Sequence, residues 1–282
     1  MDQLITAMML GLIFSIVSMA VYLSFRISDF PDLTVDGSFT LGGAMLVTLC
    51  HAGVPLVLGM LGAMFAGALA GLCTSLICIR IKVAPILSGI LMMISLYSIN
   101  LRIMNQPNLN LSVALNGWPN ELGFLVIIVG VLILILSLFL NTRLGLSLRA
   151  SGMNPIASRA FGIPIHKMTM MNVSLSNALV AIAGALFSAI EGYADVSMGA
   201  GTLITGLASV MIAEALVLTR RPGVRLLSII VGSLIYRLVI TIALNVSATG
   251  IRVSDIHLMT TALVLVTLVL SKKSRRNLSC SI

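Results

Sequence analysis

The residues that could do chemistry are few, because only nine acids and three histidines occur among 282 residues. Two ionisable groups, Glu214 and Arg237, lie inside apolar runs. Burying a charge in an apolar environment is costly, so such residues predict either a function or a specific bonding partner. Their spacing from the flanking arginines places them at different depths. We therefore expect snorkelling or bonding between helices rather than a mutual ion pair.

Two further polar clusters lie between apolar runs. Asp32 and Asp36 are four positions apart and follow Pro31, so they share one helix face if this stretch is helical. Either the two carboxylates line a solute path, or they are acids stabilised at a helix N-terminus. The second cluster holds Arg102, Asn105, Asn108 and Asn110. It either receives the carboxylate of a zwitterionic solute or is an ordinary solvated loop.

Several classes of enzyme and cofactor are not predicted. The four cysteines form no Cys-x-x-Cys pair, and the histidines lack the spacing of metal ligands. Neither His-Glu-x-x-His nor Gly-x-Ser-x-Gly occurs, so a membrane-embedded hydrolase is not indicated. Gly-Lys never occurs either, which excludes a phosphate-binding P-loop. We therefore predict no enzyme activity, no metal and no cofactor on this chain.

Composition determines the solvent in which these residues must be positioned. The chain is 59% hydrophobic and 9% charged, and its mean hydropathy is +1.12. A soluble domain is closer to one quarter charged, so most of this surface must face lipid. The net charge of +8 comes from basic residues between apolar runs. This is the distribution of cytoplasmic loops in membrane proteins, so nucleic acid is not a predicted partner.

The apolar runs predict an all-α, polytopic transmembrane bundle with about nine spans. Eight runs are long enough or nearly so: residues 4–25, 54–79, 84–101, 124–140, 168–190, 200–218, 226–244 and 257–271. Residues 38–50 are too short to span unless their helix begins near Leu33 and includes Asp36. If 38–50 is instead re-entrant, the first span inverts. Gly59, Ala63, Gly67 and Gly71 recur every four residues and predict a close helix–helix contact.

The Lys and Arg bias places the N-terminus outside and residues 144–167 in the cytoplasm. The apolar runs assign residues 1–271 to a transmembrane domain. The Lys and Arg bias assigns residues 272–282 to a basic cytoplasmic tail. Within 144–167, Asn154 is a good N-cap and Pro155 suits the first helical position. Gly162 can end the helix in a left-handed conformation. We predict an isolated helix of about two turns over residues 155–161, which either docks on a partner or rests on its own bundle.

The stretch RASGMNPIASRAFGI resembles the cytoplasmic coupling loop of ABC importer permeases of the branched-chain amino acid and ribose type. Arg149, Gly152, Asn154, Ala157, Ala160, Gly162 and Ile163 hold the matching places, with a one-residue difference before Gly-Ile. The resemblance implies that a coupling segment contacts the ATPase through Arg149, Gly152, Asn154, Pro155, Ala157, Arg159, Ala160 and Gly162.

Three other stretches extend the resemblance to most of the chain. Residues 32–43 resemble the family's entry into an early broken helix, and residues 199–216 resemble a Gly-rich segment before a late span. Ala213-Glu214 departs from that pattern, so no role is transferred there. Residues 98–111 resemble a branch often assigned to aromatic amino acids or related small solutes. The matching residues are Asn100, Leu101, Arg102, Ile103, Met104, Asn108 and Leu111.

The resemblance implies a transport subunit in the bacterial inner membrane. Its partners would be an ATP-binding subunit that hydrolyses ATP, an extracytoplasmic solute-binding protein, and a second permease copy or paralogue. Asp32, Asp36, Asn100, Arg102 and Asn108 would then lie on the translocation path or contact the binding protein. The alternative is an ion-driven secondary transporter. That class favours inverted repeats with paired intramembrane acids, whereas only Glu214 lies well inside an apolar run here.

Overall fold

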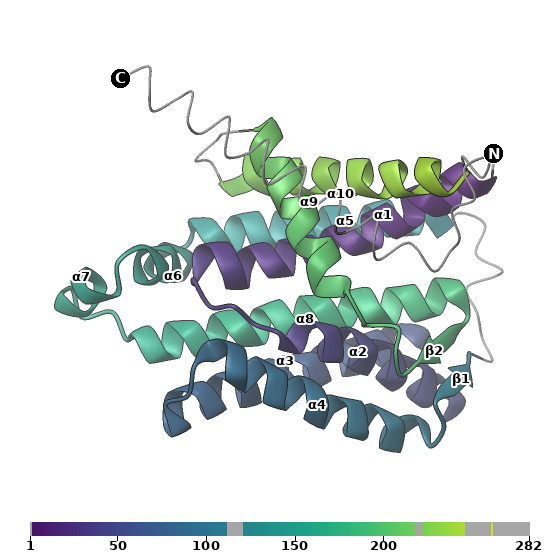
Figure 1. Cartoon of the computed structure of the whole chain (residues 1–282), viewed down its shortest axis with the longest axis horizontal. Helices are drawn as coiled ribbons and strands as arrows, with labels where there is room; N and C mark the ends of the chain where they lie inside the picture. Colours follow the sequence, from purple (N-terminus) through teal and green to yellow (C-terminus); the bar gives the residue numbers. More distant parts are fainter. Residues whose placement is uncertain (1, 112–120, 218–221, 246–260, 262–282) are drawn as a thin grey trace. The chain divides into compact units, whose positions relative to one another are not determined.

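A computed structural model describes residues 2–111, 121–217, 222–245 and 261. These residues are almost entirely helical (Figure 1). The elements are α1 (Asp2–Val21), the π-helix η1 (Tyr22–Ile27), α2 (Thr34–His51), α3 (Leu56–Ile81), α4 (Pro85–Met104), β1 (Asn108–Asn110), α5 (Glu121–Asn141), α6 (Arg143–Met153), α7 (Pro155–Ala160), α8 (Ile165–Glu191), β2 (Tyr193–Asp195), α9 (Thr202–Leu216) and α10 (Pro222–Asn245).

Six helices of the described chain are long and apolar enough to cross a membrane. They confirm an all-α, multi-pass membrane protein, because a helix satisfies all its own backbone polar groups in lipid. α2 is not among these six, and it begins at Thr34, close to the predicted start at Leu33. The predicted last span, residues 257–271, lies outside the described residues except for Thr261.

The chain divides into two compact units. Unit 1 contains α1 up to Met19, α5 from Leu122 to Ser137, and the described residues from Ile204 onward. Within it, the Ser233 hydroxyl of α10 donates a 2.8 Å hydrogen bond to the Gly11 carbonyl of α1. Gly232 lies against the Ser209 carbonyl of α9. Small residues thus allow α10 to approach both neighbours closely.

Unit 2 contains residues 20–121 and 138–203 and is built around α2, α3 and α8. Gly42 of α2 and Gly67 of α3 both lie against Ala181 of α8, and Gly184 lies against the Phe39 backbone. In lipid, helices associate through close packing rather than through the hydrophobic effect, and small residues permit that packing. The predicted stripe is therefore confirmed as a contact face, since all four of its members are buried: Gly59, Ala63, Gly67 and Gly71.

The entry to α2 is a break in regular helix at residues 28–33. α1 continues into the π-helix η1, which ends at Ile27, and Asp29 has a left-handed backbone with φ of 51°. α2 then begins inside the bundle, because the Thr34 hydroxyl bonds the Thr74 hydroxyl of α3 at 2.9 Å. Thr74 is seven residues before the end of α3, which corresponds to about 10 Å along that helix. Unit 2 therefore encloses non-helical backbone.

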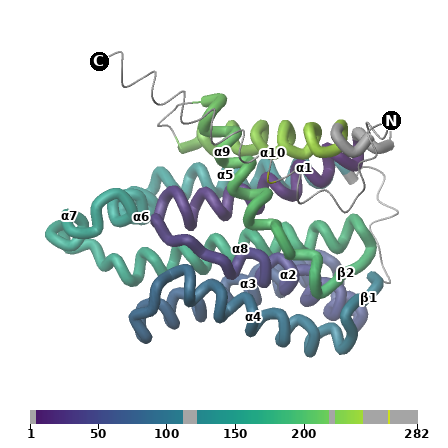
Figure 2. Tube along the Cα trace, in the orientation of Figure 1, coloured from purple at the N-terminus to yellow at the C-terminus, as the bar shows by residue number. Residues whose placement is uncertain are grey.

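The two ends of unit 2 carry different structures. α6 and α7 lie beyond one end of α8, whereas β1 and β2 lie beyond the other (Figures 1 and 2). β1 pairs antiparallel with β2, so that Asn108 faces Asp195 and Asn110 faces Tyr193. The prediction of one isolated helix in the α5–α8 connection was wrong in one respect: an eleven-residue helix, α6, precedes α7. The Thr142 side chain caps α6 by accepting from the Gly145 amide at 3.3 Å.

Gly42 and Gly130 form a matched pair of glycines within apolar helices. A methyl group at position 42 would collide with the Ala181 carbonyl, whereas one at position 130 of α5 meets nothing within 4 Å. Gly42→Ala is expected to lower the free energy of unfolding by about 1–3 kcal/mol. Gly130→Ala should preserve or raise it, because alanine is the better helix former. Thermal unfolding of both purified variants in detergent is the measurement. Equal unfolding temperatures would contradict the close α2–α8 contact.

Candidate functional site

The break before α2 is held by two amide side chains of α8. The Asn177 amide donates to the Asp32 carboxylate at 2.6 Å, and Asp32 also accepts from the Thr34 amide at 2.9 Å. The Asn172 amide donates to the Leu23 carbonyl at 2.7 Å and to the Ser28 hydroxyl at 2.6 Å. Unpaired backbone groups are costly in a bilayer, and Asp32 pairs the Thr34 N–H. The backbone itself pairs the Ser28 and Phe30 amides with the Leu23 and Ser24 carbonyls of η1. Asp32 is fully buried, and its hydrogen bonds hold the break.

Asp36 lies in the first turn of α2 and binds the start of α9. Its carboxylate accepts from the Gly201 amide at 3.1 Å, the Thr202 hydroxyl at 2.8 Å and the Leu203 amide at 2.8 Å. A carboxylate stabilises a helix N-terminus because it accepts from otherwise unpaired N–H groups and complements the helix dipole. An acid at the N-terminus of α2 was one of the two alternatives predicted for this residue. Asp36 lies in that first turn and also stabilises the N-terminus of a different helix, α9.

Asp32 and Asp36 do not share a helix face. Asp32 lies in the break and α2 begins only at Thr34, so the helical condition for that prediction is not met. Asp32 bonds Asn177 of α8, whereas Asp36 bonds residues 201–203. The two carboxylates therefore hold two different segments to the first turn of α2.

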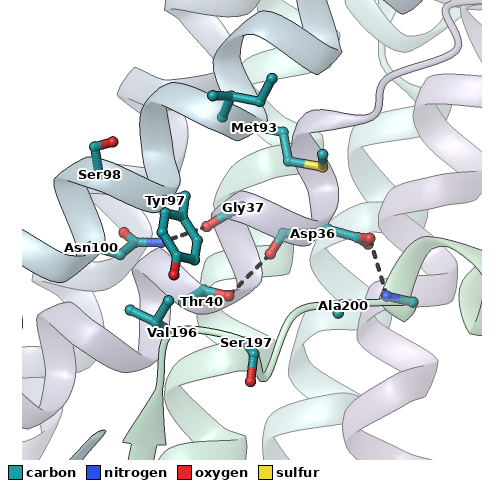
Figure 3. Close-up of a pocket in the computed structure, with 12 residues that line it drawn as sticks. Asp36, Gly37, Thr40, Met93, Tyr97, Ser98, Asn100, Val196, Ser197 and Ala200 are labelled. Carbon is teal, nitrogen blue, oxygen red and sulfur yellow. Dashed lines mark hydrogen bonds between the residues drawn. The ribbon is translucent and has the colours of Figure 1, made fainter. Parts of the chain in front are cut away.

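A cavity of about 430 Å³ lies between α2, α4 and the segment that precedes α9 (Figure 3). Its volume is within the range of small-molecule sites. α2 contributes Asp36, Gly37 and Thr40. α4 contributes Met93, Ile94, Tyr97, Ser98 and Asn100. The segment before α9 contributes Val196, Ser197, Ala200 and Gly201. Most of this wall is apolar.

Of the predicted path residues, the structure brings Asp36 and Asn100 to this cavity and leaves the others apart from it. Asn100 is 1% exposed, and its amide donates to the Gly37 carbonyl at 3.3 Å, so it links α4 to α2. Arg102 is exposed in the last turn of α4, and Asn108 is exposed in β1. These two residues lie at the end of unit 2 that carries the strand pair (Figure 1).

The segment predicted to couple to a partner is built as its sequence indicates. The Asn154 side chain caps α7 by accepting from the Ala157 amide at 3.1 Å, and Pro155 occupies the first turn. Gly162 has a left-handed φ of 77° and ends the turn. Arg159 and Ala160 are exposed on α7. Three large apolar side chains are also mostly exposed here, namely Met153 at 87%, Ile156 at 84% and Phe161 at 84%.

Two residues of the same predicted set face the bundle instead. The Arg149 guanidinium donates to the Leu140 carbonyl at 2.9 Å, which satisfies a carbonyl at the C-terminal end of α5. Gly152 lies against the Ile27 carbonyl, where a side chain would not fit. α6 therefore touches the end of η1 one residue before the break begins. Arg149 and Gly152 attach the segment to the bundle.

The two intramembrane charges in unit 1 find separate partners. Glu214 of α9 is 7% exposed and forms a 2.9 Å ion pair with Arg225 of α10. The Arg237 guanidinium lies over the Phe14 ring of α1, 5.4 Å from its centroid. Glu214 and Arg237 were expected to bond neighbouring helices rather than each other, and this geometry agrees with that expectation. Arg225 lies in the first turn of α10.

Several residues of the site were missed from sequence, among them Asn172, Asn177, Thr40 and Tyr97. The two asparagines carried a usable signal, because they are amides within the apolar run 168–190 and would be costly to bury unpaired. Thr40 and Tyr97 carried no such signal. Their place on the cavity depends on which face of α2 and α4 turns toward the segment before α9.

Residues 3–271 match a family model described as the branched-chain amino acid transport system permease component. A tyrosine transport system permease protein of Clostridioides difficile is 35% identical over 268 residues, covering 94% of this chain and 90% of the relative. The ribose import permease protein RbsC of Escherichia coli is 27% identical over 191 residues, covering 64% of this chain and 60% of the relative. No solved structure matches the chain significantly.

Asp36→Asn tests the carboxylate that binds the start of α9. An amide keeps the shape but loses the charge and one acceptor, so we expect the free energy of unfolding to fall by about 1.5–3 kcal/mol. Asp195→Asn is the matched control, because Asp195 accepts from the amide of Ser197 in an exposed turn. It should change stability by less than about 0.5 kcal/mol. The measurement is thermal unfolding of both variants in detergent. An equal loss of stability in the two variants would contradict the role assigned to Asp36.

Proposed function

Since the chain belongs to the family of branched-chain amino acid transport system permease components, we propose that it forms the translocation path for an amino acid. It is the permease component of an ABC-type transport system for small solutes. Two similarities support an amino acid as the solute. The family model is described by branched-chain amino acids, and a relative that aligns with 94% of the chain is a tyrosine transport permease.

We infer that a separate subunit hydrolyses ATP and that it binds this chain at α7. The chain has no Gly-Lys and hence no P-loop. α7 supports the inference because it is a short helix closed at both ends by Asn154 and Gly162. Its surroundings expose Met153, Ile156 and Phe161, and large exposed apolar side chains outside a lipid-facing span favour a protein partner. This exposed, doubly capped helix is the observation that carries the proposal.

The proposed orientation follows from the two ends of unit 2. Arg143, Arg149, Arg159 and Lys167 surround α7, so this end is assigned to the cytoplasm. The opposite end, with β1, β2 and Arg102, then faces outward and is where we expect a solute-binding protein to dock. A bacterial inner membrane is the proposed location. A second permease copy or a paralogue would complete the pore.

Nine spans remain the proposed topology. α2 and α9 add two shorter crossings to the six long apolar helices, and residues 257–271 supply a ninth. With the N-terminus outside, an odd number of spans leaves residues 272–282 in the cytoplasm. Their Lys272, Lys273, Arg275 and Arg276 agree with that side of the membrane.

Gly162→Val tests the coupling role, with Gly53→Val as its control. Both glycines have a left-handed backbone, φ of 77° and 81°, and neither has neighbours within 4 Å of an added Cβ. A β-branched residue should cost about 1–2 kcal/mol at either position. Gly53 joins α2 to α3, at the end of unit 2 opposite α7. We expect Gly162→Val, but not Gly53→Val, to reduce co-purification of the ATPase and solute uptake.

Arg159 provides a second variant of the same contact, because its side chain is exposed on α7. Arg159→Glu should weaken ATPase binding more than Arg159→Ala, since charge reversal adds repulsion to the lost interaction. If Gly162→Val and Arg159→Glu both assemble with the ATPase and transport at the wild-type rate, α7 is a connector only. In that case the proposed coupling is wrong.

A further inference from the structure

We propose that the cavity beside Asp36 accepts the side chain of the solute and selects aromatic or large apolar side chains, with Tyr97 as the specificity-determining residue. This inference rests on the proposed function, because it assumes that a solute passes through this chain. It adds a place for the solute and a chemical class that the cavity favours. The evidence is the state of the polar groups on the wall, the apolar surface between them, and the backbone that borders the cavity.

Three of the polar side chains on the wall, those of Asp36, Thr40 and Ser197, are already engaged in hydrogen bonds. The Asp36 carboxylate accepts three hydrogen bonds from residues 201–203. The Thr40 hydroxyl donates to the Asp36 carbonyl at 3.3 Å and accepts from the Gly199 amide at 3.2 Å. The Ser197 hydroxyl donates to the Asp195 carboxylate. A sugar would bring many hydroxyl groups, whereas the exposed polar side chains left on the wall are those of Tyr97 and Ser98. Each hydroxyl that stays unpaired reduces binding.

The remaining surface is suited to an apolar side chain. Met93, Ile94 and Tyr97 form the α4 side, and Val196 lies on the segment opposite. Figure 3 shows Met93 and Tyr97 extending from α4, and Ser197 and Ala200 on the segment before α9. The Tyr97 residue is 55% exposed, so its ring is available for contact. Aromatic rings favour offset or edge-to-face partners, and methionine adapts to irregular shapes.

The cavity borders non-helical backbone, which indicates that it faces an aqueous path rather than lipid. Residues 196–201 form turns between β2 and α9. They reach the level of Asp36, to which the Gly201 amide donates, and the next residue, Gly37, lies against the Met93 backbone. Met93 is eleven residues before the end of α4, or about 16 Å along the helix. At that depth, irregular backbone is tolerated only when it is buried in protein or lines a water-filled cavity.

Uptake of L-tyrosine by the complete importer in proteoliposomes tests the role of Tyr97. Tyr97→Ala should lower the uptake rate by about tenfold, a change equivalent to ~1.4 kcal/mol. Tyr97→Phe keeps the ring and should retain the wild-type rate. Phe65→Ala is the matched control, because Phe65 is 65% exposed on α3 and does not line the cavity. ATP hydrolysis stimulated by the tyrosine-loaded binding protein should be unchanged in all three variants, which separates solute contact from assembly.

Thiol protection tests the location of the solute without truncating Tyr97. Ser98 and Ser95 are both exposed on α4, but only Ser98 lines the cavity. In a chain with Cys50, Cys73, Cys78 and Cys280 replaced by serine, L-tyrosine transported by the complete importer should slow thiol labelling of Ser98→Cys. It should leave Ser95→Cys unaffected, and D-ribose should protect neither.

The outcomes separate this inference from the proposed function. Equal L-tyrosine uptake by wild type and Tyr97→Ala, or equal labelling of Ser98→Cys with and without L-tyrosine, overturns the inference alone. A wild-type importer that carries D-ribose and no amino acid overturns both the solute class and this inference, and leaves the permease role intact.

Discussion

The rest of unit 2 depends on the hydrogen bonds that Asn172 and Asn177 of α8 make at the break in helical structure. In lipid, backbone groups without partners are costly, so a chain can leave the helix at residues 28–33 only where side chains replace the missing bonds. Asn172 adds a second donor to the Leu23 carbonyl of η1. Asn177 holds Asp32, which in turn accepts from the first turn of α2. This arrangement lets α2 begin inside the bundle. Its first turn is therefore free to present Asp36 to the start of α9.

α8 connects the features to which we assign function. It begins just after α7, carries the two asparagines in its middle, and ends just before β2. Gly152 of α6 rests on the Ile27 carbonyl, so the segment proposed to bind the ATPase touches the chain next to the break. The first turn of α2, on the other side of the break, lines the cavity. A movement of α7 would therefore have a short physical route, through packed backbone, to the wall of the cavity.

The sequence was most informative where the physical signal is local. Apolar runs located the long helices, and Asn154 with Gly162 predicted α7 because capping depends on neighbouring residues. α6 was missed because its polar surface carries no apolar run. The partners of Asp36 could not be predicted, since Leu203 is 167 positions away and depends on the packing of three elements. The cavity could not be predicted for the same reason. Its wall combines α2, α4 and the segment before α9, which are far apart in the sequence.

The central claim is that the bond between Asp32 and Asn177 holds the break, and exchanging the two side chains tests it most directly. Asn177→Asp alone places two carboxylates together in a buried site and should destabilise the chain by about 3–5 kcal/mol. Adding Asp32→Asn restores one donor and one acceptor, so thermal unfolding of the exchanged chain should return close to that of wild type. Strictly additive losses in the two single variants and the double variant would mean that the residues do not interact, and would contradict the account.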